Sequence, residues 1–93
     1  MKYRIREGIL LRKVCDVWLL IAVGDAVNHC KYVCEINESL AYYWQLLEQG
    51  LTTDAIVDKA ASDYDAPKSQ IEKDVKTLVN QLCNMGYIIE ETA

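Results

Sequence analysis

The residues best suited to chemistry are a histidine and two cysteines that lie close together in the sequence. His29 is the only histidine, Cys30 follows it directly, and Cys34 comes four residues later. A histidine beside a thiol can activate it as a nucleophile, but catalysis also needs a group that orients the histidine and donors that stabilise an oxyanion. No motif around these residues provides either, so we expect no enzymatic activity.

The same three side chains carry atoms that bind zinc. Structural zinc sites usually combine two closely spaced ligand pairs, and the other two cysteines, Cys15 and Cys83, are isolated in the sequence. In an extended strand Cys30 and Cys34 would lie about 13 Å apart, too far to share one ion. The sequence predicts no metal site and no cofactor, and it favours free thiols that pack as small apolar side chains.

The composition is that of one globular domain spanning residues 1–93. The 93 residues are 52% hydrophobic and 26% charged, with four glycines and one proline, which excludes a disordered chain. The longest apolar run, Val17–Val23, is far shorter than the roughly twenty residues of a membrane-spanning helix. No signal peptide is recognisable, and we expect a cytoplasmic protein that does not enter a membrane.

Charge is distributed unevenly along the chain. Residues 1–33 carry six Lys and Arg against three Asp and Glu, whereas residues 34–93 carry four against eleven. Proteins that read nucleic acid usually concentrate positive charge on the element that contacts it. The acidic second part therefore argues against nucleic acid as a partner.

Three strands are predicted between residues 9 and 36. Residues 9–14 and 17–23 are apolar and partly β-branched, and Cys15-Asp16 between them fits a tight turn. Cys30–Ile36 follows as the third strand. Because residues 17–23 are apolar on both faces, this segment is expected at the centre of an antiparallel meander.

Three helices are predicted between residues 38 and 86. Asn37 is a good N-cap for the first helix, which Gly50 ends, and Thr52 or Thr53 caps the second. Pro67 can open the third helix, and Ser69 begins a capping-box sequence just after it. The apolar stripe of that helix is Ile71, Val75, Leu78, Val79, Leu82 and Met85. After Gly86, residues 87–89 either add a short strand or pack as an apolar tail. The order βββααα predicts an α+β fold, with a three-stranded antiparallel sheet followed by a three-helix bundle.

This architecture offers a surface rather than a catalytic site. A three-stranded sheet has two edges whose N–H and C=O groups are free to pair with another chain, which also allows a homodimer. Where the third helix lies beside an outer strand, the two form a groove. An extended peptide can add a strand there and insert alternate side chains between strand and helix.

The order of motifs from residue 36 onwards resembles the PqqD-like proteins. Ile36-Asn37-Glu38-Ser39 enters a helix with Trp44 and Leu47, and Gly50-x-Thr52 opens a second helix with Ile56. The pattern continues through Tyr64-Asp65, Asp74-Val75, Leu78, Leu82 and Gly86-Tyr87-Ile88. These small proteins take their name from the D component of pyrroloquinoline quinone biosynthesis and are also called RiPP recognition elements, after the ribosomally made peptides they serve.

The resemblance implies a winged-helix-like fold that binds the leader of a precursor peptide and presents it to a modifying enzyme. That enzyme is a radical SAM enzyme or, in lasso-peptide systems, a leader peptidase. The resemblance also implies that the leader pairs with the third strand and packs against the third helix. The implied contacts are Tyr32, Val33, Cys34 and Glu35 on the strand and Ile71, Asp74, Val75, Leu78, Gln81 and Leu82 on the helix.

A winged-helix DNA-binding regulator is the alternative function. Its recognition helix would be the third helix, which offers Lys68, Lys73 and Lys76. Glu72 and Asp74 are interleaved with these lysines, so we favour the peptide-binding function.

Overall fold

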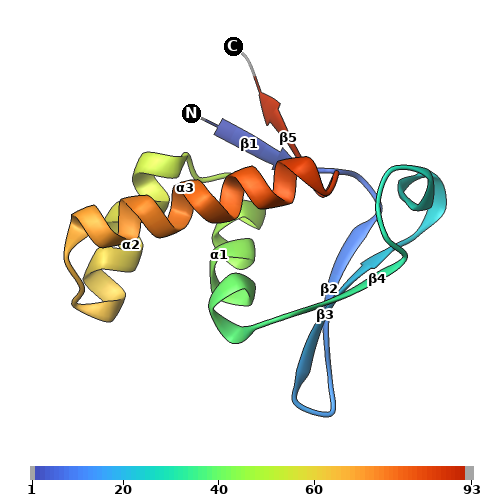
Figure 1. Cartoon of the computed structure of the whole chain (residues 1–93), viewed down its shortest axis with the longest axis horizontal. Helices are drawn as coiled ribbons and strands as arrows, with labels where there is room; N and C mark the ends of the chain where they lie inside the picture. The colour runs from blue at the N-terminus through green and yellow to red at the C-terminus, as the bar shows by residue number, and fades with distance from the viewer. Residues whose placement is uncertain (1, 92–93) are drawn as a thin grey trace.

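The computed structural model describes residues 2–91. Three helices pack together, a three-stranded sheet extends away from them, and a two-stranded ribbon joins the two ends of the chain (Figure 1). The α+β class and the order of three strands followed by three helices are confirmed, with one further strand at each end.

The larger sheet is an antiparallel meander of β2 (Ile9–Val14), β3 (Val17–Ala22) and β4 (Val33–Ile36). Its order is β2-β3-β4, which confirms the central position predicted for the second of these strands. Cys15 and Asp16 connect β2 to β3 with φ angles of 50° and 65°. Two successive residues in the left-handed region are typical of a type I′ hairpin turn, whose twist suits the flanking strands.

The third strand is shorter than the predicted Cys30–Ile36. A 3-10 helix, η1 (Gly24–Asn28), precedes it, and β4 begins only at Val33. The carbonyl of Ala26 accepts hydrogen bonds from the backbone N–H groups of His29 and Cys30, at 3.0 and 3.2 Å. These bonds continue the helical turn through Cys30, so the chain becomes extended only after this residue.

A second, two-stranded sheet forms from the ends of the chain. β1 (Lys2–Ile5) pairs antiparallel with β5 (Ile88–Glu91). Of the two alternatives for the segment after Gly86, the short strand is therefore the one formed. β1 itself was not predicted, because its partner lies more than eighty residues away in the sequence.

The three helices are α1 (Glu38–Glu48), α2 (Thr53–Tyr64) and α3 (Lys68–Asn84). The Oδ1 atom of Asn37 accepts from the N–H of Leu40 at 2.8 Å, and the Oγ1 atom of Thr52 accepts from the N–H of Ala55 at 3.2 Å. Both caps satisfy amide groups that a helix start leaves unpaired. The predicted starts of α1 and α2 are confirmed, and Thr52 rather than Thr53 is the second cap.

Of the two candidates for the start of α3, Pro67 is the one used, two residues before the capping-box serine, Ser69. Pro67 occupies the N-cap position, and its carbonyl accepts from the N–H groups of Gln70 and Ile71. Because proline has a fixed φ and no N–H to satisfy, it starts the helix without the capping box. Ser69 therefore lies inside the first turn.

One core joins the helices to both sheets. Its largest fully buried side chains come from β3, α1, α2, α3 and the segment before β5, and they are Leu20, Trp44, Ile56, Leu82 and Tyr87. Within residues 2–91 the helices are all too short or too polar to cross a membrane.

Candidate functional site

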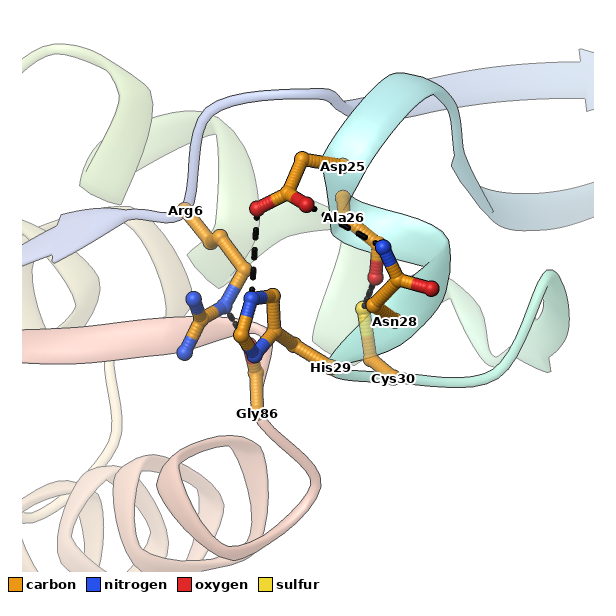
Figure 2. A network of polar contacts seen from close by, with 7 residues as sticks. All are labelled: Arg6, Asp25, Ala26, Asn28, His29, Cys30 and Gly86. Atoms are coloured by element: carbon orange, nitrogen blue, oxygen red, sulfur yellow. Dashed lines mark hydrogen bonds and ion pairs between the residues drawn. The ribbon is translucent and has the colours of Figure 1, made fainter.

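His29 lies in an exposed polar network at the end of η1. Its Nε2 atom is 3.3 Å from Oδ2 of Asp25, and the amide of Asn28 donates to Oδ1 of the same carboxylate at 3.1 Å (Figure 2). The hydrogen bond from Asn28 has the largest effect on the pKa of Asp25, which it lowers, and the contact with His29 lowers it further. Nearby, Nε of Arg6 donates to the carbonyl of Gly86 at 2.7 Å. The first contacts stay within η1 and its end, and the Arg6 bond joins the segment between β1 and β2 to the end of α3, so both have a structural role.

Cys30 is not arranged as a nucleophile. Its thiol donates to the carbonyl of Ala26 at 3.2 Å, away from the Asp25–His29 contact (Figure 2). Burial raises the pKa of this thiol, and a reactive cysteine needs the opposite shift. Among the residues that the structure describes, no three His, Cys, Asp or Glu side chains gather closely enough to hold a metal ion.

The outer edge of β4 is the feature that can engage another chain. β4 is an edge strand, because β3 is its only neighbour in the sheet of the described chain. The N–H of Ala22 donates to the carbonyl of Tyr32 at 2.8 Å, so these two residues form a hydrogen-bonded pair. Such pairs alternate with non-bonded pairs along an antiparallel ladder.

This alternation separates the four predicted strand residues into two sets. Tyr32 and Cys34 turn their backbone groups towards β3, whereas Val33 and Glu35 direct theirs towards the outer edge. The Glu35 carbonyl receives a long contact of 3.8 Å from the Cys34 thiol. Val33 and Glu35 therefore present the backbone groups to which a further strand can pair.

The side chains of the same segment also alternate. Cys34 is half-buried against the core, whereas Val33 and Glu35 are exposed on the opposite face. Tyr32 lies just before β4 and is 65% exposed. An added strand would thus run beside a partly apolar strip formed by Cys34 and the half-buried Ile36.

The six predicted residues of α3 also form two groups. Ile71, Val75 and Leu82 are buried in the core, with at most 5% of their surface exposed. Asp74 and Gln81 are exposed and Leu78 is half-buried, and helical spacing places these three on one flank of the helix. Of the six predicted residues, these three are the ones that leave the core, and Met85 lies on the same flank.

Two observations place that flank on the side of α1. Burial raises the pKa of Tyr43 on α1, and the carboxylate of Asp74 adds to the shift, so Asp74 lies near α1. The opposite flank of α3 lines a cavity of about 490 Å³ that it shares with residues of the ribbon, Tyr3 and Glu90. The flank of Asp74 and Leu78 is therefore the one on the side of α1, the helix into which β4 leads.

The end of α3 meets the segment before β4. A Cβ atom on Gly86 would lie 2.5 Å from the carbonyl oxygen of His29, so the two backbones are in direct contact. Tyr87 follows, and its hydroxyl donates to the carbonyl of Lys31 at 3.3 Å. The Cys34 thiol lies beside the same hydroxyl and, after burial itself, helps to raise the pKa of Tyr87 to about 12.

Residues that the sequence assigned only to the core complete this surface. We call the β4 edge and the exposed flank of α3 the β4–α3 surface. Ile36 and Leu40 are half-buried where β4 enters α1, and Met85 is 39% exposed at the end of α3. Helical spacing had placed Leu40 and Met85 on apolar stripes, but spacing alone does not say which end of a stripe lies outside the core.

Comparison with known proteins gives one family and two related folds. The family model for coenzyme PQQ synthesis protein D (PqqD) matches residues 28–88. The structure of TbiB1 in complex with the TbiA(beta) leader peptide is 18% identical and has a TM-score of 0.78, with 97% of this chain and 99% of that chain covered. The structure of lasso peptide synthetase B1 complexed with the leader peptide is 20% identical and also has a TM-score of 0.78. It covers 97% of this chain and 100% of that chain.

Among proteins with curated descriptions, none matches the chain significantly. At identities of 18% and 20% the two structures show a shared fold. The family match is a separate finding, and it covers well over half of the 93 residues, from η1 through the three helices to the start of β5. The chain belongs to the PqqD family.

Proposed function

We propose that this protein is a non-catalytic adaptor that captures the leader of a ribosomally synthesised precursor peptide. The observation that carries the proposal is the outer edge of β4, which no other strand of the described chain pairs with, and the segment before it is held to the end of α3 through Gly86 and Tyr87. The two proteins of the same fold are both described in complex with leader peptides, which supports a ligand of this class. The whole chain acts as one peptide-binding domain.

The leader binds by strand addition. Its backbone pairs with the N–H and C=O groups of Val33 and Glu35, the two residues that direct them outward. Alternate leader side chains then point towards Cys34 and Tyr32 on one face of the extended sheet. Backbone pairing supplies affinity, and these side-chain positions supply specificity.

The second wall of the site is the exposed flank of α3. Leu78 supplies apolar contact, while Asp74 and Gln81 supply polar contacts at either side of it. Ile71, Val75 and Leu82 support this wall from within the core, because their side chains are buried beneath it. They act on the peptide by fixing the position of the helix.

The bound leader is then presented to a separate modifying enzyme, a radical SAM enzyme or a leader peptidase. No cofactor is needed for this role, because the adaptor only holds the peptide in an extended form. Ordering the leader in advance lowers the entropic cost of its encounter with the enzyme.

Calorimetric titration tests this function. The pure protein is titrated with the synthetic leader half of a precursor peptide encoded beside its gene, and backbone amide NMR shifts are followed in parallel. We expect saturable binding of micromolar strength or better, with shifts on residues 33–36 and on the α3 segment 74–82. A scrambled leader of the same composition is the peptide control.

Two charge variants of α3 locate the site. Asp74→Arg should change the affinity several-fold without unfolding the protein, because Asp74 is exposed and belongs to the proposed second wall. Glu72→Arg is the control, since it makes the same change in net charge and Glu72 is exposed on the opposite flank of α3. Absence of binding to every leader encoded nearby, with a well-dispersed NMR spectrum, would contradict the proposal.

A further inference from the structure

The face of the β2–β3–β4 sheet that points away from the core is apolar. Side chains alternate between the two faces, and Ile9, Leu20 and Ala22 are buried on the core side. The register places Leu10, Ile21 and Val33 in one row across the other face, and Arg12, Leu19 and Glu35 in the next row. We call this the outer sheet face.

On the outer sheet face, Leu10, Leu19 and Ile21 are half-buried, and among the described residues they belong neither to the core cluster nor to the side chains packed against it. Val33 is 44% exposed, and Val14, next to Val17 at the end of the same face, is 51% exposed. Figure 1 shows the β2–β3 hairpin extending away from the helices. An antiparallel sheet with one face in water usually carries polar residues there, so an apolar outer face indicates a protein partner.

The charges on this face favour a second copy of the same chain. Arg12 on β2 and Glu35 on β4 lie at opposite ends of one row, with Leu19 between them. The Arg12 guanidinium donates to the neighbouring carbonyl of Leu11 at 2.8 Å. A two-fold axis that runs parallel to β3, midway between the two facing sheets, would set Arg12 of each copy opposite Glu35 of the other. It would also set the apolar row of one copy opposite the apolar row of the other.

We propose that two copies dimerise through their outer sheet faces. The contact is isologous, with two identical Arg12–Glu35 pairs around a Leu19–Leu19 centre. The sheets pack about 10 Å apart with their strands within about 30° of each other, as in aligned sandwiches. The β4 edge and α3 remain uncovered, so the dimer has two β4–α3 surfaces and does not depend on the proposed function.

The size of the face predicts a weak dimer. Three strands about 4.8 Å apart, with about six residues rising about 3.3 Å each, give a footprint of roughly 300 Å² per copy. Stable interfaces bury about 800 Å² per partner. We therefore expect a dissociation constant of roughly tens to hundreds of micromolar.

Sedimentation velocity of the full chain between about 1 and 500 µM tests the dimer. Arg12→Glu and Glu35→Arg should each raise the dissociation constant at least tenfold, since each places like charges opposite one another twice. The double variant R12E/E35R restores opposite charges and should recover the wild-type value within about twofold. Lys73→Glu and Glu72→Arg, on exposed positions of α3, are controls with the same changes in net charge.

Each outcome decides the proposal. Loss of the dimer in both single variants and its recovery in the double variant would establish this interface. A monomer at every concentration would overturn the proposal and leave the outer sheet face to a different protein. A dimer that does not respond to Arg12→Glu would also overturn it, because pairing through the β4 edges does not involve Arg12. Circular dichroism melts confirm that all variants are folded.

Discussion

At the scale of single residues, Tyr87 connects three parts of the fold. Its side chain is fully buried, and its ring meets that of Trp44 on α1 edge-on, with centroids 6.4 Å apart. Its hydroxyl donates to the carbonyl of Lys31 and lies beside the Cys34 thiol of β4. The end of α3 is thus fixed to both α1 and the strand that offers its edge to a peptide.

Tyr87→Phe tests this connection through its pH dependence. Burial, followed by Cys34, raises the pKa of Tyr87 to about 12, above the value of about 10 for an unfolded chain. Because the pKa is raised in the folded state, the contribution of the protonated Tyr87 hydroxyl to the free energy of unfolding is complete below pH about 10. This contribution is lost as the pH rises through about 12. Tyr87→Phe lacks this loss, so its free energy of unfolding should decline less steeply between these pH values.

At pH 7 the same variant should lose about 0.5–1.5 kcal/mol of unfolding free energy, the usual contribution of one hydrogen bond. Urea denaturation at pH 7, 10 and 12 measures both effects. Tyr32→Phe is the control, because Tyr32 is 65% exposed. An equally steep alkaline decline in Tyr87→Phe and in the wild type would show that other groups cause it.

Gly86 and Gly50 form a matched pair for a second prediction. Both have positive φ, +86° and +79°, but only at Gly86 would a Cβ atom meet backbone, 2.5 Å from the His29 carbonyl oxygen. Gly50→Ala should cost about 1–2 kcal/mol, the strain of a left-handed conformation. Gly86→Ala should cost clearly more, because it also separates α3 from the segment before β4. Equal losses in chemical denaturation would mean that this contact is unimportant.

At the scale of elements, the directions of the backbone groups in β4 make a prediction about proline. Val33→Pro removes an N–H that points outward, so the β3–β4 ladder should persist and the melting temperature should change little. Leader binding should weaken at least tenfold, because the peptide loses a backbone partner. Cys34→Pro removes an inward bond and should instead destabilise the fold. Melting curves and leader titrations of both variants separate the two effects.

Locally determined elements could be predicted from the sequence. The caps Asn37 and Thr52 and the turn at Cys15-Asp16 act on groups within four residues, and all three have their predicted roles. β1 could not be predicted, because Lys2–Ile5 becomes a strand only by pairing with residues 88–91. The start of β4 was misplaced because the Ala26 carbonyl holds His29 and Cys30 in a turn.

The candidate site was predictable in outline only. An apolar stripe on α3 identifies the helix but not the division between core and surface, which depends on how closely α1 and α2 pack against it. Ile71, Val75 and Leu82 prove to be core residues, whereas Asp74, Leu78 and Gln81 reach the surface. Likewise, only the pairing register shows that Val33 and Glu35, not Tyr32 and Cys34, direct their backbone groups outward.

At the scale of the whole molecule, the net charge of −4 opposes binding to DNA. Of the three lysines near the start of α3, Lys68 is 2.8 Å from the carboxylate of Asp58, and the others have acidic neighbours on the same helix. We expect fluorescence anisotropy with duplex DNA to show no affinity that falls steeply with salt. A steep salt dependence would favour the alternative of a DNA-binding regulator.

The β1–β5 ribbon has a mechanical consequence. Lys2 pairs with Glu91 at the outer end of the ribbon, and Ile5 pairs with Ile88 at the inner end. A force that draws the two ends apart therefore acts on one residue pair at a time rather than on all pairs together. Once the ribbon opens, Tyr3 and Ile88 lose their cover. A single-molecule pulling experiment, or an unfolding protease that grips one end, should open this domain at low force, from its ends inward.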